Sequence, residues 1–185
     1  IGGMAAATVL LLSGCSVFRG IFVGSKGKIC PAAAVLVDTS YLTVFRPDLQ
    51  NDPAGALYTV SLDGVNTDCS FDNREGQTDS SLHLTFHATH APIGEAVNYS
   101  VPYYVAVTQG DRILRKNNFI AHFNFAPGAS TTEFREDVDS TVINLENGKR
   151  PYDYEILVGL QLTPAERDYN KTMGRFAQCP RWPPN

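Results

Sequence analysis

The sequence has 185 residues, of which 43% are hydrophobic and 18% are charged, and its net charge is −4 at neutral pH. This balance is typical of a folded globular protein and excludes an intrinsically disordered one. A negatively charged chain without a segment rich in Lys and Arg also excludes nucleic acid as a partner, because phosphate neutralisation supplies most of that affinity.

The first fourteen residues have the character of a signal peptide. Residues 4–12 are uncharged and consist mainly of Ala, Val and Leu. The run is too short for a membrane span, which needs roughly 20 apolar residues. A short apolar run followed by small residues is typical of a signal-peptide core and its cleavage site. The usual positive start is missing, so we expect residues 1–14 to be a signal peptide truncated at its start.

The segment Leu12-Ser13-Gly14-Cys15 follows this run and resembles the lipobox of bacterial lipoproteins. The resemblance implies that the Cys15 sulfur receives a diacylglycerol and that the preceding peptide is removed. Each buried methylene of the acyl chains contributes about 0.8 kcal/mol to membrane binding. An ordinary secretory signal with a chance Cys is the alternative. By the same resemblance, Ser16 after the lipidated Cys favours the outer membrane.

The rest of the chain is expected to form a single domain. Residues 15–29 contain several Gly and Ser residues and are expected to be a flexible tether. A domain over residues 30–175 has an ordinary length for one hydrophobic core. A Pro-rich tail at 176–185 completes the chain.

Three cysteines remain if Cys15 carries lipid. An exported protein occupies a compartment in which disulfides persist. Cys30 precedes the first strand-like run and Cys69 lies in a later one, so we expect a Cys30–Cys69 disulfide between neighbouring strands. Cys179 is left over, and it either binds a partner's thiol or displaces one member of that pair.

The hydrophobic pattern from residue 32 onward has a period of two, which is typical of half-buried antiparallel strands. The alternation is strictest in 81–89, where Leu82 and Leu84 face one way and His83 the other. Gly110 is the expected positive-φ residue of a hairpin. The predicted strands are 32–37, 41–45, 56–63, 81–89, 101–108, 112–125, 131–138 and 154–162.

Short strands separated by Gly and Pro favour an all-β, antiparallel two-sheet sandwich over an α/β fold. Immunoglobulin-like topology is the first expectation and a small barrel the second. Thr163, Pro164 and Glu166 form a capping box, which predicts one short C-terminal helix ending near Met173. We expect this helix to pack over an open end or edge of the sandwich.

His83, His87 and His90 form the polar cluster that most suggests a metal site. On a strand rising about 3.3 Å per residue, the first two would lie about 13 Å apart. Two ligands of one zinc ion must each lie about 2.1 Å from it. His90 has the opposite parity to His87. We therefore expect a solvated strand face, with no metal and no cofactor.

The sequence also lacks a recognisable catalytic arrangement, since it has no Gly-x-Ser-x-Gly elbow and no Cys in a signature context. The carboxylates of Glu136, Asp137 and Asp139 are expected on an exposed strand, where a charged edge limits aggregation. We expect no enzymatic activity.

Two aromatic sites are candidates for protein contacts. Tyr103 and Tyr104 are consecutive in a predicted strand and must face opposite ways, so one of them is expected to be exposed. Trp182 in the Pro-rich tail is the other candidate. Exposed aromatic residues are favoured at protein interfaces.

Together with the lipobox, the segments 30–38 and 102–107 resemble small proteobacterial lipoproteins with an immunoglobulin-like body. That resemblance implies no activity. We expect a lipid-anchored accessory or interaction subunit of an envelope complex, on the periplasmic side of the outer membrane and with an envelope protein as partner. The alternative is an envelope enzyme or small-ligand binder with its site in loops around 90–98 and 109–118. A third possibility is self-assembly into a surface lattice.

Overall fold

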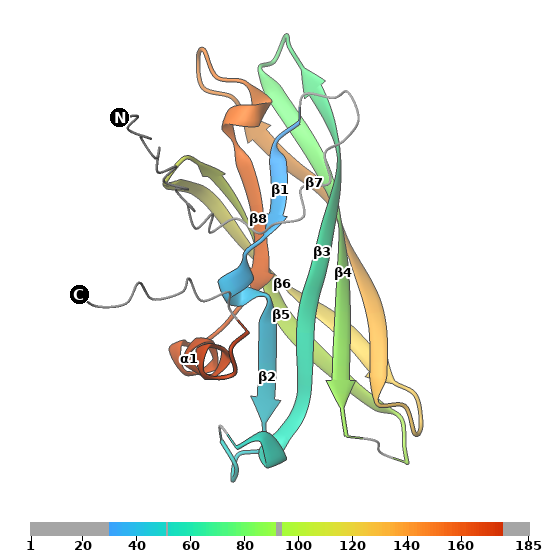
Figure 1. The fold of residues 1–185 in the computed structure, drawn as a ribbon. Coiled ribbons are helices and arrows are strands. Elements are labelled where there is room, and N and C mark those ends of the chain that lie inside the picture. The colour runs from blue at the N-terminus through green and yellow to red at the C-terminus, as the bar shows by residue number, and fades with distance from the viewer. Residues whose placement is uncertain (1–29, 51, 92–93, 176–185) are drawn as a thin grey trace, which may run out of the picture.

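The computed structural model describes residues 30–50, 52–91 and 94–175. In this part of the chain, eight β-strands form two sheets that pack face to face, and one α-helix lies near the end (Figure 1). The all-β sandwich with one short C-terminal helix is therefore confirmed. Cys15, Cys179 and Trp182, together with the predicted signal peptide, tether and tail, lie outside the described residues.

Each sheet has four strands. Sheet A contains, in spatial order, β1 (Ala32–Val35), β8 (Glu155–Leu160), β5 (Val97–Gln109) and β6 (Arg112–Phe125). Sheet B contains, in spatial order, β2 (Tyr41–Phe45), β3 (Ala56–Asp72), β4 (Gln77–His90) and β7 (Thr131–Asn144). All neighbouring strands are antiparallel except β1 and β8.

The chain passes repeatedly from one sheet to the other. β3 and β4 form a hairpin in sheet B, and β5 and β6 form a hairpin in sheet A with Gly110 at φ +55° in its turn. β7 then pairs with β4, and β8 pairs with β5. The fold shares the two-sheet architecture of immunoglobulin-like domains but has its own strand order. Sheet B has the order β2-β3-β4-β7, so its second and third positions are filled by strands that are consecutive in the chain. The corresponding positions of an immunoglobulin sheet hold the second and fifth strands of the domain.

The hydrophobic core lies between the sheets and follows from the alternation seen in the sequence. The inward-facing residues of β4, including Leu82, Leu84 and Phe86, are fully buried. The Phe134 ring of β7 stacks on Phe86 at 4.9 Å and on Phe123 of β6 at 4.6 Å, both between ring centroids. These contacts join three strands from the two sheets, so the sandwich is filled by side chains from both.

β3 and β7 are longer than the sequence pattern predicted, because a bulge changes the parity of each. In β3 the register shifts after Leu62, and the next inward-facing residue is Val65 rather than Gly64. In β7 the inward positions change from Val138 to Thr141 beside a register shift. A bulge adds one residue to one strand, so a strict period-two pattern stops there although the strand continues.

The helix α1 (Pro164–Thr172) covers the outer strand of sheet B, as expected. Its capping box is present, with Glu166 N–H donating to Thr163 Oγ1 at 3.3 Å and Thr163 N–H donating to Glu166 Oε2 at 2.6 Å. The Asn170 side chain is only 1% exposed and donates to the Tyr41 carbonyl of β2 at 2.7 Å. The helix thus supplies a hydrogen bond to an edge of sheet B at which the described residues place no further strand.

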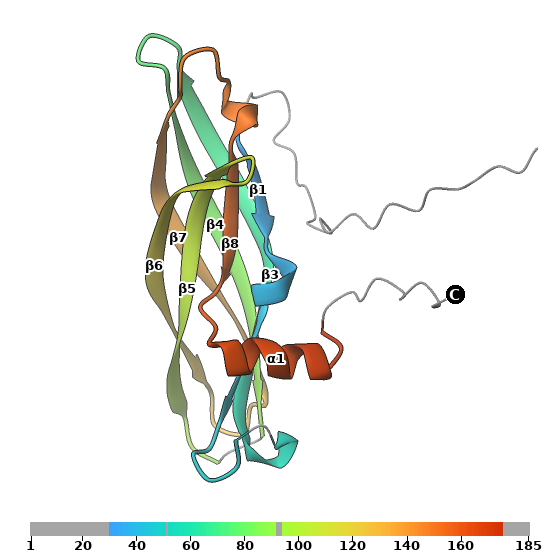
Figure 2. The same ribbon diagram turned by 90° about the vertical axis from the view of Figure 1, so that its left-hand side faces the viewer.

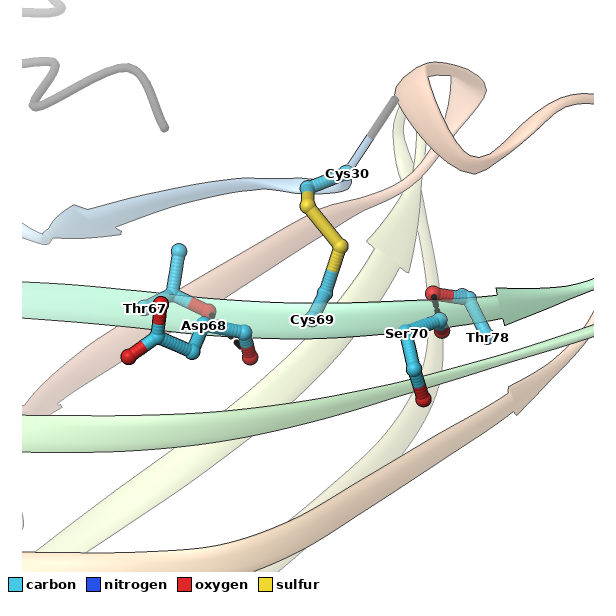
Figure 3. The surroundings of a disulfide bond; sticks show 6 residues. All are labelled: Cys30, Thr67, Asp68, Cys69, Ser70 and Thr78. Atoms are coloured by element: carbon cyan, nitrogen blue, oxygen red, sulfur yellow. Dashed lines mark hydrogen bonds between the residues drawn. A yellow bond between two sulfur atoms is a disulfide. The ribbon is translucent and has the colours of Figure 1, made fainter. Parts of the chain in front are cut away.

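A disulfide joins Cys30 to Cys69, with their Cα atoms 5.9 Å apart (Figure 3). This is the pairing expected from the sequence, but its position differs from that expectation. Cys30 precedes β1 in sheet A and Cys69 lies in β3 of sheet B, so the bond connects opposite sheets rather than neighbouring strands. The reason is that the first described strand, β1, lies in sheet A, and the chain then crosses to β2 in sheet B through η1 (Val37–Thr39).

Candidate interaction site

The outer face of sheet B carries a polar cluster centred on His83. His83 of β4 lies between two carboxylates, with Nδ1 2.7 Å from Asp137 Oδ1 and Nε2 3.8 Å from Asp68 Oδ2. All three side chains are exposed to solvent. His90 faces the other way, and its ring centroid lies 3.8 Å from that of Phe125. No group of His, Cys, Asp or Glu in the described ranges is placed to hold a metal ion.

A groove of about 500 Å³ lies between η2 (Pro53–Gly55) and α1. Its lining is mainly apolar and includes Tyr169 and Met173. The carboxylate that it contains, Asp168, is already paired with Lys171 at 3.2 Å. The groove therefore offers no set of converging titratable groups for catalysis.

Both members of the Tyr103–Tyr104 pair are buried, so the expectation that one would be exposed is wrong. Tyr103 faces the core, is 2% exposed and stacks on Phe119 at 5.2 Å between centroids. Its burial raises its pKa to about 12. Tyr104 faces the opposite side but is only 7% exposed, because Thr39 lies 2.9 Å from its hydroxyl and Lys116 Nζ lies 4.1 Å from its ring centroid.

The outer strands of the two sheets differ in how well they are covered. β1 has four residues and β2 lies under α1. β6 and β7 have 14 residues each and lie on the same side of the sandwich, away from β1 (Figure 2). Arg112 pairs with Glu146 at 2.8 Å, and Arg115 Nη2 donates to the Val142 carbonyl at 2.8 Å. We call the surface formed by these two outer strands the β6–β7 side.

β6 exposes large apolar side chains on this side. Ile113 is 68% exposed and Ile120 is 62% exposed, and Leu114 is also exposed. These are three of the six exposed large hydrophobic residues in the described part of the chain. A long outer strand with exposed apolar residues is a template for pairing with another chain. β6 is therefore the strongest candidate for a protein-binding site.

The backbone of β6 has alternate groups free for such pairing. The Gln161 N–H donates to the Pro102 carbonyl at 2.9 Å, so the backbone polar groups of Pro102 point toward β8. Pro102 lies opposite Ile120 in the β5–β6 register. Residues that face each other without exchanging hydrogen bonds point their backbone groups outward. The N–H and C=O groups of Ile120, and of the residues two and four positions from it, therefore point toward the open edge.

The two outer strands carry opposite charges. β6 contains Arg112, Arg115 and Lys116 and no carboxylate. Among the described residues, neither Arg115 nor Lys116 has a carboxylate within ion-pair distance. β7 has a net charge of −3, because it contains four carboxylates and one arginine. Its charged residues are Glu133, Arg135, Glu136, Asp137 and Asp139.

Glu136 differs from the other carboxylates of β7 because it faces the interior and is half-buried. Burial raises its pKa, His122 lowers it, and the negative charge of Asp137 raises it further, so that the net shift is upward. An inward-facing charge on an outer strand disfavours pairing with an apolar strand. A strand that pairs with β7 is therefore expected to place a polar or cationic residue opposite Glu136.

No protein-family model, curated protein or solved structure matches this chain. In the described ranges, none of the helices combines the length and the apolar character that crossing a bilayer requires. The exposed apolar residues of β6 and the opposite charges of β6 and β7 make the β6–β7 side the favoured site. Sequence reasoning placed residues 112–125 in a strand but did not identify it as an outer one. It expected Glu136, Asp137 and Asp139 on an exposed, charged edge; β7 is an edge strand and exposes Asp137 and Asp139, but the expectation is wrong for Glu136, which faces the interior.

Proposed function

We propose that this protein is a lipid-anchored, non-catalytic interaction protein of the bacterial cell envelope, which binds its partner through the β6–β7 side. The observation that supports binding is β6, an outer strand that no other described element covers, with Ile113 and Ile120 exposed. The lipobox-like segment ending at Cys15 supports the anchor. The core is filled with side chains, and the polar clusters described above lie open on the surface, so a binding role is favoured over catalysis.

Site-specific photo-crosslinking in native membranes tests the binding role. A photoreactive amino acid in place of Ile120 should give a crosslinked product, because this side chain lies on the open edge. The same substitution at Asp63 is the matched control, since Asp63 is exposed but lies in β3, which has neighbours on both sides. A protein that gives no Ile120-dependent product would contradict the proposal.

The anchor is tested separately by mass spectrometry of the mature amino terminus. We expect a diacylglyceryl group on Cys15 and loss of residues 1–14. Cys15→Ala should release the protein from the membrane fraction, because the acyl chains provide the binding energy. An unmodified Cys15 thiol on a membrane-free protein would remove the anchor from the proposal and leave the binding role standing.

A further inference from the structure

We propose that the partner of the β6–β7 side is a second copy of this chain, with β6 of each protomer adding antiparallel to β7 of the other around a two-fold axis. This inference rests on the proposed function, because it names the partner of the same surface. It would join sheet A of each protomer to sheet B of its partner and leave neither long strand uncovered.

The arrangement of the strands allows both pairings to form at once. β6 and β7 lie on one side of the sandwich, each at the edge of a different sheet (Figure 2). A two-fold axis parallel to the strands exchanges the two sheets, so β6 meets the partner's β7. β6 and β7 follow each other through a tight turn at 126–130 and run in opposite directions. A rotation about an axis parallel to the strands does not change these directions, so β6 and the partner's β7 are antiparallel. Such an isologous interface is closed and does not propagate into a fibre.

Charge selects this dimer over the other two-fold arrangement. An axis perpendicular to the sheets would place β6 against β6 and β7 against β7, so that like-charged strands face each other. The axis parallel to the strands instead places the cationic β6 against the acidic β7. Residues 16–29 and 176–185 include Arg19, Lys26, Lys28 and Arg181 but no carboxylate, so they do not supply an acidic strand for β6.

The hydrogen-bonding groups of the two strands have matching parity. In β6 the backbone groups of the even-numbered residues around Ile120 point to the open edge, as described above. In β7 the relation is fixed by His90 N–H, which donates to the Ser130 carbonyl at 3.0 Å. Even-numbered residues up to Val138 therefore point toward β4, and odd-numbered residues point to the open edge. In both strands, the residues whose backbone groups point to the open edge have side chains on the outer face of the sandwich. Backbone pairing between the two strands therefore aligns outer face with outer face and inner face with inner face.

One register combines these constraints. When Lys116 lies opposite the partner's Asp137, Asn118 lies opposite the partner's Arg135, and on the inner face Phe119 lies opposite the partner's Phe134. The same register places Asn117 opposite the partner's Glu136. The inward-facing carboxylate then meets an amide rather than an apolar side chain. This meets the expectation of a polar residue opposite Glu136.

Cysteine crosslinking between separately expressed chains tests the pairing. In a full-length background lacking Cys15 and Cys179, Asn118→Cys and Arg135→Cys chains are mixed and mildly oxidised. Directly opposed residues that exchange hydrogen bonds have Cα atoms about 5.5 Å apart, which suits a disulfide. We expect a crosslinked dimer in the mixture and none from either chain alone. A dimer from Asn118→Cys alone would indicate β6–β6 pairing and overturn the inference.

Charge reversal provides a second test by sedimentation equilibrium of the full chain. Lys116→Glu should raise the dimer dissociation constant roughly tenfold, since two symmetric ion pairs become repulsive. Lys116→Glu combined with Asp137→Lys should restore dimerisation. Circular dichroism checks that each variant is folded. A protein that is monomeric at all concentrations, yet crosslinks through Ile120 to a different protein, would refute the second copy as partner and leave the proposed function intact. No association of any kind would refute both.

Discussion

Removing the disulfide between the sheets should cost a large share of the stability of the fold. Cys30 and Cys69 are 39 residues apart in the sequence. Closing a loop of that length in the unfolded chain lowers its entropy by about 13 cal/mol/K, which corresponds to about 4 kcal/mol near room temperature. A domain of this kind has a total free energy of unfolding of about 5–15 kcal/mol. The Cys30→Ala/Cys69→Ala variant should therefore remain folded but with a much reduced margin.

Urea denaturation followed by circular dichroism measures this loss. The reference chain carries alanine at Cys15 and Cys179, so that the only thiols compared are those of the pair. Alanine rather than serine replaces Cys69 because that side chain is buried. A second comparison, of the reference chain with and without reductant, should give a similar loss. A decrease in the free energy of unfolding below about 1 kcal/mol in both comparisons would refute the chain-entropy reasoning.

Three further substitutions test individual contacts. Gly159→Ala would place a Cβ 2.7 Å from the Tyr104 hydroxyl and should cost about 1–3 kcal/mol in thermal melts, whereas Gly64→Ala, with open space around its Cβ, should change stability little. Asn170→Ala should cost about 1–3 kcal/mol in urea titrations, because it leaves the edge carbonyl of β2 without its donor; an unchanged midpoint would contradict this. Burial makes Glu136 hold its proton more tightly in the folded protein, so stability falls as pH rises above its ordinary pKa of 4.5. Glu136→Gln should therefore raise the melting temperature at neutral pH but not well below pH 4.5. Equal shifts at the two pH values would refute the conclusion that the ionised Glu136 carboxylate destabilises the fold.

The sequence predicted the elements of the fold better than their arrangement. Every predicted strand is present, and the capping box at Thr163 placed the helix correctly because its signals are local. β3 and β7 were predicted too short, because the bulges after Leu62 and after Val138 each reverse the parity on which the hydrophobic pattern depends. Strand order depends on contacts between distant segments, so the position of Cys69 in the opposite sheet from Cys30 was not predictable from their spacing.

The candidate site depended even more on tertiary structure. Alternation correctly placed Tyr103 and Tyr104 on opposite faces of β5, but it gave no information about what covers the outer face. Thr39 and Lys116 do so, and they come from segments far apart in the sequence. Alternation also placed Ile120 on the face opposite Phe119 and Ala121, but it could not show that this face is left exposed. The strand order shows that, within the described part of the chain, β6 has a neighbouring strand on one side alone.

The disulfide also determines how the domain responds to tension. Without the bond, a pull on the chain preceding Cys30 would act directly on β1, a four-residue strand held to sheet A by its parallel pairing with β8. Through Cys69 the load passes instead into β3, which is hydrogen-bonded to β4 over most of its length (Figure 3). Many bonds in that ladder then share the force, and β1 is relieved of it. The disulfide thus transfers the force from β1 to β3. Reducing it would make β1 the first strand to detach under tension.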